Sequence, residues 1–203
     1  MQKYGCINMF PITEMERKNG YFYQNQRLDP LIHIRVAVKS DAHKIADFYM
    51  QLTDTNKAKF APHDFKAEYL SDQILENSSY IAVIAENTTT KELIGYAVSQ
   101  LWIFDYDIER WATYEIRIDN EHKKFACIAP AVSLKYQYAG IGTKLVQSTI
   151  RILKEKLYED VLLWGGVKCQ NVPAVQFYLK NGFKLIGHFE YQGGNYDMHL
   201  KID

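Results

Sequence analysis

A glycine-bearing turn at residues 137–143 reads Gln-Tyr-Ala-Gly-Ile-Gly-Thr and directly precedes an amphipathic segment. Glycine at positions 140 and 142 would let an anion approach the backbone closely. Successive N–H groups of such a turn, together with the N-terminus of a following helix, form a concavity with positive potential. The turn lacks the lysine of a Walker loop and the third glycine of a dinucleotide fingerprint. The stretch therefore predicts a phosphate site of another kind, and a purely structural turn is the alternative.

A second stretch, residues 171–183, carries polar and aromatic side chains at helical spacing. Asn171 stands just before Pro173, and proline is typical of the first turn of a helix. Ala174 and Tyr178 are four residues apart, so they share one face of that helix. Taken alone, the stretch reads equally well as a capped amphipathic helix that packs on a core.

Hydrophobic periodicity places these two stretches in an ordered series of elements. Strands are predicted at residues 32–38, 80–85, 93–104, 124–134, 161–167, 183–191 and 195–202. Helices are predicted after Ser40 and Asp41, at 64–76, at 142–158 and from Pro173 to Gly182, with a polar loop at 53–63. Residues 105–123 form a charged insertion with strand character at 113–118. Because antiparallel strands come first and a crossover follows, the order predicts a mixed sheet and the α+β class.

Length and composition indicate one globular domain. The chain has 203 residues, 47% of them hydrophobic, with 24 basic and 24 acidic side chains. A formal net charge of zero disfavours a nucleic-acid binder, which usually carries a basic excess. No apolar run reaches the roughly 18 residues of a membrane span, so a cytoplasmic protein is expected. Residues 1–31 are predicted to form an irregular extension before a domain at 32–203, and Cys6, Cys127 and Cys169 match no zinc or disulfide spacing.

The two stretches together resemble the signature of a known family. Gln137-x-x-Gly140-x-Gly142 is followed, one helix and one strand later, by Asn171-x-x-Ala174-x-x-Phe177-Tyr178-x-x-x-Gly182-Phe183. This combination, and the order of elements across residues 32–202, resembles the GNAT superfamily of N-acetyltransferases. The resemblance implies a mixed, mostly antiparallel central sheet, flanked by helices and splayed at the central strand to hold acyl-CoA.

The resemblance further implies acetyl-CoA as co-substrate, without a metal. Backbone groups at the end of the central strand would pair with the pantetheine arm like an added strand, so we expect the sheet to open after Ser133. The turn would wrap the pyrophosphate, and Gly142→Glu is expected to abolish coenzyme A binding while leaving the fold intact. The implied cofactor-binding residues are Ala131, Val132, Ser133, Leu134, Gln137, Tyr138, Ala139, Gly140, Ile141, Gly142, Thr143, Asn171, Ala174 and Tyr178.

The implied reaction is direct transfer of the acetyl group to a primary amine. Tyr178 would point at the thioester sulfur and protonate the leaving thiolate, and a backbone N–H of the central strand can polarise the thioester carbonyl. A carboxylate suits the removal of a proton from the amine, and Glu115 is the predicted general base. Glu121 and His122 compete for this role, and an exposed Glu115 paired with an arginine is the alternative.

The amine is expected to belong to a small molecule, such as an amino sugar, a polyamine or an amino acid. Loops at 53–63 and 104–111 would wall its pocket, and the aromatic candidates to line it are Trp102, Phe104, Tyr106 and Trp111. Core packing explains Trp102 equally well. Alternative functions are acetylation of a protein amine, a catalytically idle acyl-CoA sensor, and a nucleotide- or nucleic-acid-binding module. No membrane or nucleic-acid partner is expected, and the chain is expected to act as a monomer or homodimer.

Overall fold

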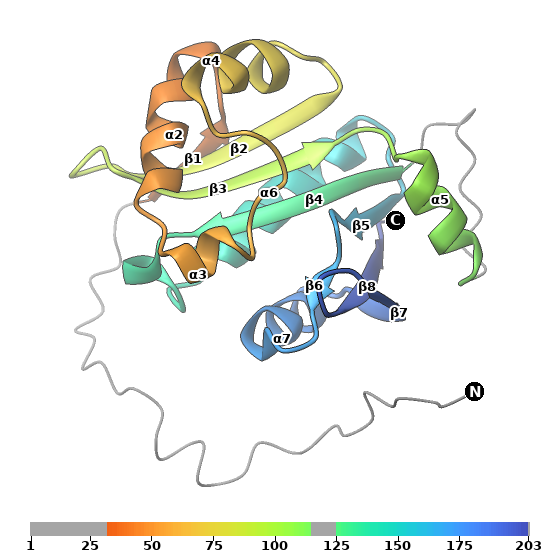
Figure 1. The fold of residues 1–203 in the computed structure, drawn as a ribbon. Helices are drawn as coiled ribbons and strands as arrows, with labels where there is room; N and C mark the ends of the chain where they lie inside the picture. The colour runs from red at the N-terminus through yellow and green to blue at the C-terminus, as the bar shows by residue number, and fades with distance from the viewer. Residues whose placement is uncertain (1–31, 115–124, 203) are drawn as a thin grey trace, which may run out of the picture.

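The computed structural model describes residues 32–114 and 125–202, which form a mixed eight-stranded sheet with helices on both faces (Figure 1). Its strands are β1 (Ile32–Val36), β2 (Tyr80–Asn87), β3 (Leu93–Gln100), β4 (Phe125–Val132), β5 (Asp160–Leu163), β6 (Val167–Lys168), β7 (Lys184–Glu190) and β8 (Gly194–Lys201). Their order is β1-β2-β3-β4-β5-β8-β6, and β7 pairs with β8. Among the described pairs, β4 and β5 run parallel and the others antiparallel, so the predicted α+β class is confirmed.

Helices form a layer on each face of the sheet. They are η1 (Lys39–Asp41), α2 (Ala42–Met50), α3 (Asp54–Lys57), α4 (Ala67–Tyr69), the π-helix η2 (Leu70–Leu75), α5 (Asp105–Ala112), η3 (Leu134–Tyr136), α6 (Ile141–Glu155) and α7 (Val172–Lys180). Alternate residues of β2 face opposite layers, because successive side chains of a strand point to opposite sides. Val83 packs in one core with α6, and Ile84 packs in the other core with α2. In Figure 1, α6 passes behind β3 and β4, whereas α2 and α4 lie on the other side.

The long helix α6 follows from apolar residues that recur every four positions. Ile141, Leu145 and Leu153 are each at most 1% exposed. Thr149 lies on the same buried face, and its hydroxyl donates to the Leu145 carbonyl oxygen at 2.9 Å, so the polar group is satisfied. Each buried leucine contributes about 1.5–3 kcal/mol. This packing holds the N-terminus of α6 beside the end of β4.

The sheet opens between β4 and its neighbour β5. β4 pairs with β3 as far as its end, but with β5 only as far as Ile128. The Trp164 N–H donates to the Ile128 carbonyl oxygen at 3.0 Å. The chain then turns away through Gly165 and Gly166, which both have left-handed φ angles, 72° and 70°. The predicted opening is therefore present, but it begins after Ile128 and not after Ser133.

A second prediction was wrong. The segment at 161–167 forms two strands, β5 and β6, and the same two glycines separate them. Both pair with β8, at successive positions. The predicted strand at 93–104 ends at Gln100, and part of the charged insertion forms the helix α5. Thr113 and Tyr114 lie in a turn, and the rest of the predicted strand at 113–118 lies outside the described residues.

Candidate active site

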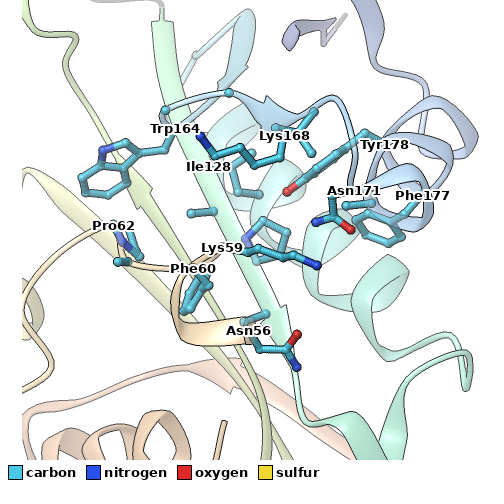
Figure 2. Close-up of a pocket in the computed structure, with 18 of the residues that line it drawn as sticks. Asn56, Lys59, Phe60, Pro62, Ile128, Trp164, Lys168, Asn171, Phe177 and Tyr178 are labelled. Atoms are coloured by element: carbon cyan, nitrogen blue, oxygen red, sulfur yellow. The ribbon is translucent and has the colours of Figure 1, made fainter. Parts of the chain in front are cut away.

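A cavity of about 1820 Å³ lies along the open edge of β4 and brings the two predicted motifs together. Its walls come from the loop after α3, from β6 and α7, and from the turn before α6 (Figure 2). The predicted cofactor-binding residues that line it are Ala131, Val132, Gln137, Tyr138, Gly140, Gly142, Thr143, Asn171, Ala174 and Tyr178. A single drug-sized ligand needs about 300–1,000 Å³, so the cavity has room for a larger ligand together with an acceptor.

Four of the predicted cofactor-binding residues are not part of the cavity wall: Ser133, Leu134, Ala139 and Ile141. The Ser133 N–H already donates to the Ile94 carbonyl oxygen on β3, at 2.9 Å. Leu134 is 61% exposed on η3, whereas Ile141 is 1% exposed in the core beneath α6. Ile141 thus anchors the turn, and residues on either side of it face the cavity.

The turn before α6 has the backbone geometry of an anion site. Gly140 is the N-cap of α6 in a left-handed conformation (φ 79°), and Tyr138 is left-handed as well (φ 64°). Such a turn directs successive N–H groups toward one point, and the first N–H groups of α6 have no partner within the helix. A left-handed non-glycine residue costs about 1–3 kcal/mol and is typical of ligand-binding loops. These features fit a bound pyrophosphate.

Gly142 serves the packing of two helices as well as the approach of a ligand. A Cβ atom at this position would lie 3.0 Å from Cε2 of Phe177 on α7, so the ring would have to move. Gly142→Glu would therefore have to displace this ring, so a loss of coenzyme A binding in that variant would be mixed with a change in the contact between α6 and α7. Thr143, in the first turn of α6 and on the cavity wall, is a better position for a test of phosphate binding.

Tyr178 and Asn171 reach the cavity from α7. Figure 2 shows the Tyr178 hydroxyl pointing from α7 toward β4, with Asn171 facing the same space. Tyr178 is 9% exposed, and its ring packs edge-on against Phe177 and Phe183 at centroid distances of 5.2 and 5.4 Å. Burial raises the pKa of the Tyr178 hydroxyl, because the charged form would be poorly solvated. The group therefore stays protonated at neutral pH and acts as a hydrogen-bond donor.

A buried ion cluster on α5 borders another part of the cavity, which Asp107 and Arg110 help to line. Nη1 of Arg110 lies 2.6 Å from an Asp107 carboxylate oxygen, and its Nε lies 2.8 Å from an Asp197 oxygen on β8. The guanidinium also lies over the Phe189 ring, 4.0 Å from its centroid. Sequence reasoning missed this cluster, although the i, i+3 spacing of Asp107 and Arg110 was a signal for a helix.

The prediction of which aromatic side chains line the acceptor pocket is only partly correct. Phe104 lines the cavity, together with Tyr80 and Trp164. Trp111 is fully buried in a small apolar cluster with Cys127, so it belongs to the core and not to the pocket. Trp102 packs edge-on against Tyr80, with ring centroids 4.8 Å apart, and is not part of the cavity wall.

Carboxylates that could deprotonate an amine are present at the cavity. The predicted base and its two rivals, Glu115, Glu121 and His122, lie outside the described residues, as does the side chain of Tyr106. In the part of the chain that the structure describes, the cavity-lining carboxylates are Asp107 and Glu190. Asp107 is 5% exposed, and burial raises its pKa despite the opposing effect of Arg110. A carboxylate with a raised pKa is a better proton acceptor near neutral pH.

His63 joins the predicted acceptor loop at 53–63 to the sheet. Its Nδ1 lies 2.8 Å from the Asp64 carbonyl oxygen, which can only accept, so Nδ1 carries the proton. Nε2 then accepts a hydrogen bond from the Tyr96 hydroxyl on β3, at 2.9 Å. Burial lowers the pKa of His63 to about 4. This pair fixes one wall of the cavity.

The free energy of unfolding should fall as the pH is lowered from 6.5 to 4. The unfolded chain takes up a proton at His63 near pH 6.5, whereas the folded protein takes it up only near pH 4. The difference corresponds to about 3 kcal/mol. Urea unfolding at a series of pH values will measure it. His63→Phe should flatten the slope in this window and the matched change at exposed His43 should not, and equal slopes in both variants would contradict the assignment.

Residues 32–114 and 125–202 contain no group of three or more His, Cys, Asp or Glu side chains placed to hold a metal ion. None of the described helices is long and apolar enough to cross a membrane.

Known proteins resemble this chain in sequence and in fold. The model of the acetyltransferase (GNAT) family matches residues 45–183. An N-alpha-acetyltransferase of Sulfurisphaera tokodaii is 28% identical over 124 residues, which are 61% of this chain and 65% of that protein, so the chain spans less than two thirds of this relative. The GNAT domain of S. lividans PAT has a similar fold, with a TM-score of 0.67, 15% identity, and coverage of 84% of this chain and 90% of that chain. The PaiA N-acetyltransferase of Thermoplasma acidophilum in complex with coenzyme A has a TM-score of 0.59 and 19% identity. The match covers 84% of this chain and 99% of that chain.

Proposed function

This chain belongs to the acetyltransferase (GNAT) family, and on that premise we propose that it transfers the acetyl group of acetyl-CoA to the primary amine of a small molecule. One observation carries the proposal: the left-handed turn at the N-terminus of α6 and the unpaired edge of β4 face the same cavity. The turn suits the pyrophosphate of coenzyme A, because its N–H groups converge on one point. The strand edge suits the amide-containing pantetheine arm, which can pair with it as an added strand.

The reaction forms a C–N bond and breaks the C–S bond of the thioester. We assign the removal of a proton from the incoming ammonium to Asp107, directly or through a water molecule. The thiolate released on C–S cleavage takes its proton from the Tyr178 hydroxyl, which burial keeps protonated. The nitrogen loses its second proton as the amide forms, and this proton restores the Tyr178 hydroxyl. The products are the acetylated amine, the free thiol of coenzyme A and one proton, which passes from Asp107 to solvent. No residue has to form a covalent bond to the acetyl group.

The side chains around Asp107 favour an acceptor whose charge is only positive, such as a polyamine, over an amino acid, which also carries a carboxylate. Three nitrogen atoms of Arg110 are committed to Asp107 and Asp197, so the guanidinium is not available to a substrate carboxylate. Two carboxylates around one guanidinium leave a net negative charge, which an ammonium group would compensate. The aromatic rings of Phe104 and Trp164 in the same cavity can also contact a cation. Of the acceptors considered, a polyamine or an amino sugar therefore suits the site better than an amino acid.

Coenzyme A binding tests the proposal most directly. Thr143→Glu places a carboxylate in the first turn of α6, on the cavity wall, where it would repel a bound pyrophosphate. Because an acidic residue in the first turn suits the helix dipole, the fold should survive. We expect the dissociation constant for coenzyme A to rise at least tenfold, a loss of about 1.4 kcal/mol or more. Isothermal titration calorimetry will measure it.

Gln147→Glu is the matched control, because it adds the same charge one helical turn later at an exposed position of α6. It should bind coenzyme A like the wild-type protein. Unchanged affinity in Thr143→Glu would remove the pyrophosphate assignment, and no binding by the wild-type protein would remove the proposed function. Acetylation of a panel of polyamines, amino sugars, amino acids and peptide N-termini, followed by mass spectrometry, will then identify the acceptor class.

A further inference from the structure

The open edge of β4 offers a ligand fewer N–H groups than a regular strand would. In an antiparallel ladder, alternate residues direct both backbone groups toward the partner strand. The Ser133 N–H donates to Ile94 on β3, so every second residue before Ser133 also faces β3. The bond from the Trp164 N–H to the carbonyl of residue 128 on the other side agrees with this alternation. The residues of this half of β4 that face away from β3 are therefore Ile128, Pro130 and Val132.

Pro130 stands in the middle of this edge, and proline has no N–H. The Val132 carbonyl oxygen already accepts a hydrogen bond from Nε2 of Gln137, at 3.3 Å. Beyond Ile128, where the pairing with β5 ends, the strand thus offers the gap one N–H, that of Val132, and the carbonyl of Pro130. An acyl-CoA with its pyrophosphate at the turn would run along β4 from Val132 toward Ile128. Its thioester would therefore lie next to Pro130, where the strand presents an acceptor instead of a donor.

We propose that the Tyr178 hydroxyl donates the hydrogen bond that polarises the thioester carbonyl, a bond that a strand N–H would make if residue 130 were not proline. The hydroxyl points toward β4 from the opposite wall of the cavity (Figure 2). It stays protonated, because burial disfavours the charged form. Lys168, another donor on this wall, is held by the carbonyl oxygens of Tyr191 and Gln192, at 2.6 and 2.9 Å from its Nζ. This assignment rests on the proposed function and adds to the role of Tyr178 toward sulfur.

One hydroxyl can serve both steps, because oxygen and sulfur are bound to the same carbon of the thioester. When the amine adds, an electron pair moves onto the carbonyl oxygen, and the Tyr178 O–H stabilises the negative charge there. When the C–S bond breaks, the electron pair returns to form the amide carbonyl, and the Tyr178 proton passes to the sulfur. The nitrogen then gives up its surplus proton, which restores the Tyr178 hydroxyl. A donor aimed at such an oxygen is worth about 10²–10³ in rate.

The hydrogen bond can be detected without turnover, by infrared difference spectroscopy of bound acetyl-CoA labelled with ¹³C at the carbonyl. No amine is present in this experiment. We expect the C=O stretch to lie at lower frequency in the wild-type complex than in free acetyl-CoA. The shift should be lost in Tyr178→Phe, which keeps the ring and its packing. It should return in the double variant Pro130→Ala/Tyr178→Phe, because alanine restores an N–H on the open edge.

Turnover should follow the same pattern. We expect Tyr178→Phe to lower kcat by about 10²–10³-fold, and Pro130→Ala to recover about tenfold of this loss in the double variant. Recovery should be partial, because phenylalanine cannot protonate the thiolate. Pro130→Ala alone should not raise kcat, because the wild-type carbonyl already has a donor. Loss of the proline ring by itself would have the same effect in both backgrounds, so rescue confined to the Tyr178→Phe background separates the two explanations.

Three results would overturn the assignment: a wild-type complex without a carbonyl shift, a shift that persists in Tyr178→Phe, or an equal effect of Pro130→Ala in both backgrounds. If Pro130→Ala fails to fold, the spectra of the wild-type protein and Tyr178→Phe decide alone. Binding of acetyl-CoA is recorded in the same samples. A protein that binds acetyl-CoA but shows no shift refutes the role of Tyr178 only, whereas a protein that does not bind acetyl-CoA refutes the proposed function as well.

Discussion

Arg110→Met is expected to lower the free energy of unfolding by about 3–5 kcal/mol, because it leaves two buried carboxylates without their counter-ion. Asp107 and Asp197 are 5% and 1% exposed, and Arg110 lies within 2.8 Å of both. Methionine preserves much of the side-chain volume, so the loss reports the charge and not a cavity. Urea unfolding at pH 7 will measure it. The loss should shrink as the pH is lowered, because Asp107, whose pKa burial already raises, takes up a proton and no longer needs a counter-ion.

Lys39→Met provides the control. Lys39 pairs with Glu76 at 2.8 Å, but both side chains are more than half exposed, so solvent screens the pair and its removal should have no measurable effect. Adding Asp197→Asn to Arg110→Met should recover part of the lost stability, because one of the two unpaired charges is removed. If both methionine variants unfold at the same urea concentration, the cluster on α5 does not stabilise the fold.

Gly166→Ala should destabilise the protein by about 2–5 kcal/mol, whereas the same change at the adjacent Gly165 should cost only about 1–2 kcal/mol. Both glycines are left-handed, so alanine suffers the same backbone strain at either position. The difference is space. A Cβ at Gly166 would lie 2.8 Å from the Tyr196 carbonyl oxygen and 2.8 Å from the Phe189 ring, whereas a Cβ at Gly165 meets nothing within 4 Å.

This pair of variants isolates the contact between the turn and β8, because backbone strain cancels in the comparison. Denaturant unfolding will give the two free energies, and coenzyme A binding will report whether the cavity keeps its shape. Both glycines line the cavity, but only at Gly166 would a Cβ collide with neighbouring atoms and shift the cavity wall, so Gly166→Ala should also weaken binding more than Gly165→Ala. Equal losses at the two positions would show that the close approach to Tyr196 and Phe189 has no energetic importance.

The parts of the site that could be predicted from sequence are those with local causes. Gly140 is left-handed at the N-cap of α6, a conformation that glycine adopts readily, so the sequence of the turn was informative. Pro173 stands in the first turn of α7, as its fixed φ angle favours. The apolar repeat in α6 likewise needs only the helical period. These local rules located the turn and the two helices that border the cavity.

The remaining features depend on residues far apart in the chain. The apolar run at 161–167 reads as one strand although Gly165 and Gly166 are a local turn signal, and only the pairing of β6 with β8 beyond them is a distant contact. α5 mixes aromatic and charged residues, and it is held by the contact of Arg110 with Asp197, 87 positions later. His63 meets Tyr96 across 33 positions. No local pattern encodes such contacts, so this end of the cavity could not be assembled from the sequence.

An unpaired strand edge also invites a foreign chain to pair with it, which is a common beginning of aggregation. The open part of β4 is such an edge when the cavity holds no ligand. Pro130 presents no N–H there, and Gln137 already occupies the carbonyl of Val132, so an intruding strand would find few partners for its backbone. The proline that leaves the thioester without a strand donor therefore also protects the empty protein from strand invasion. A residue with an N–H at position 130 would give the thioester a donor on the strand, but it would also remove this protection.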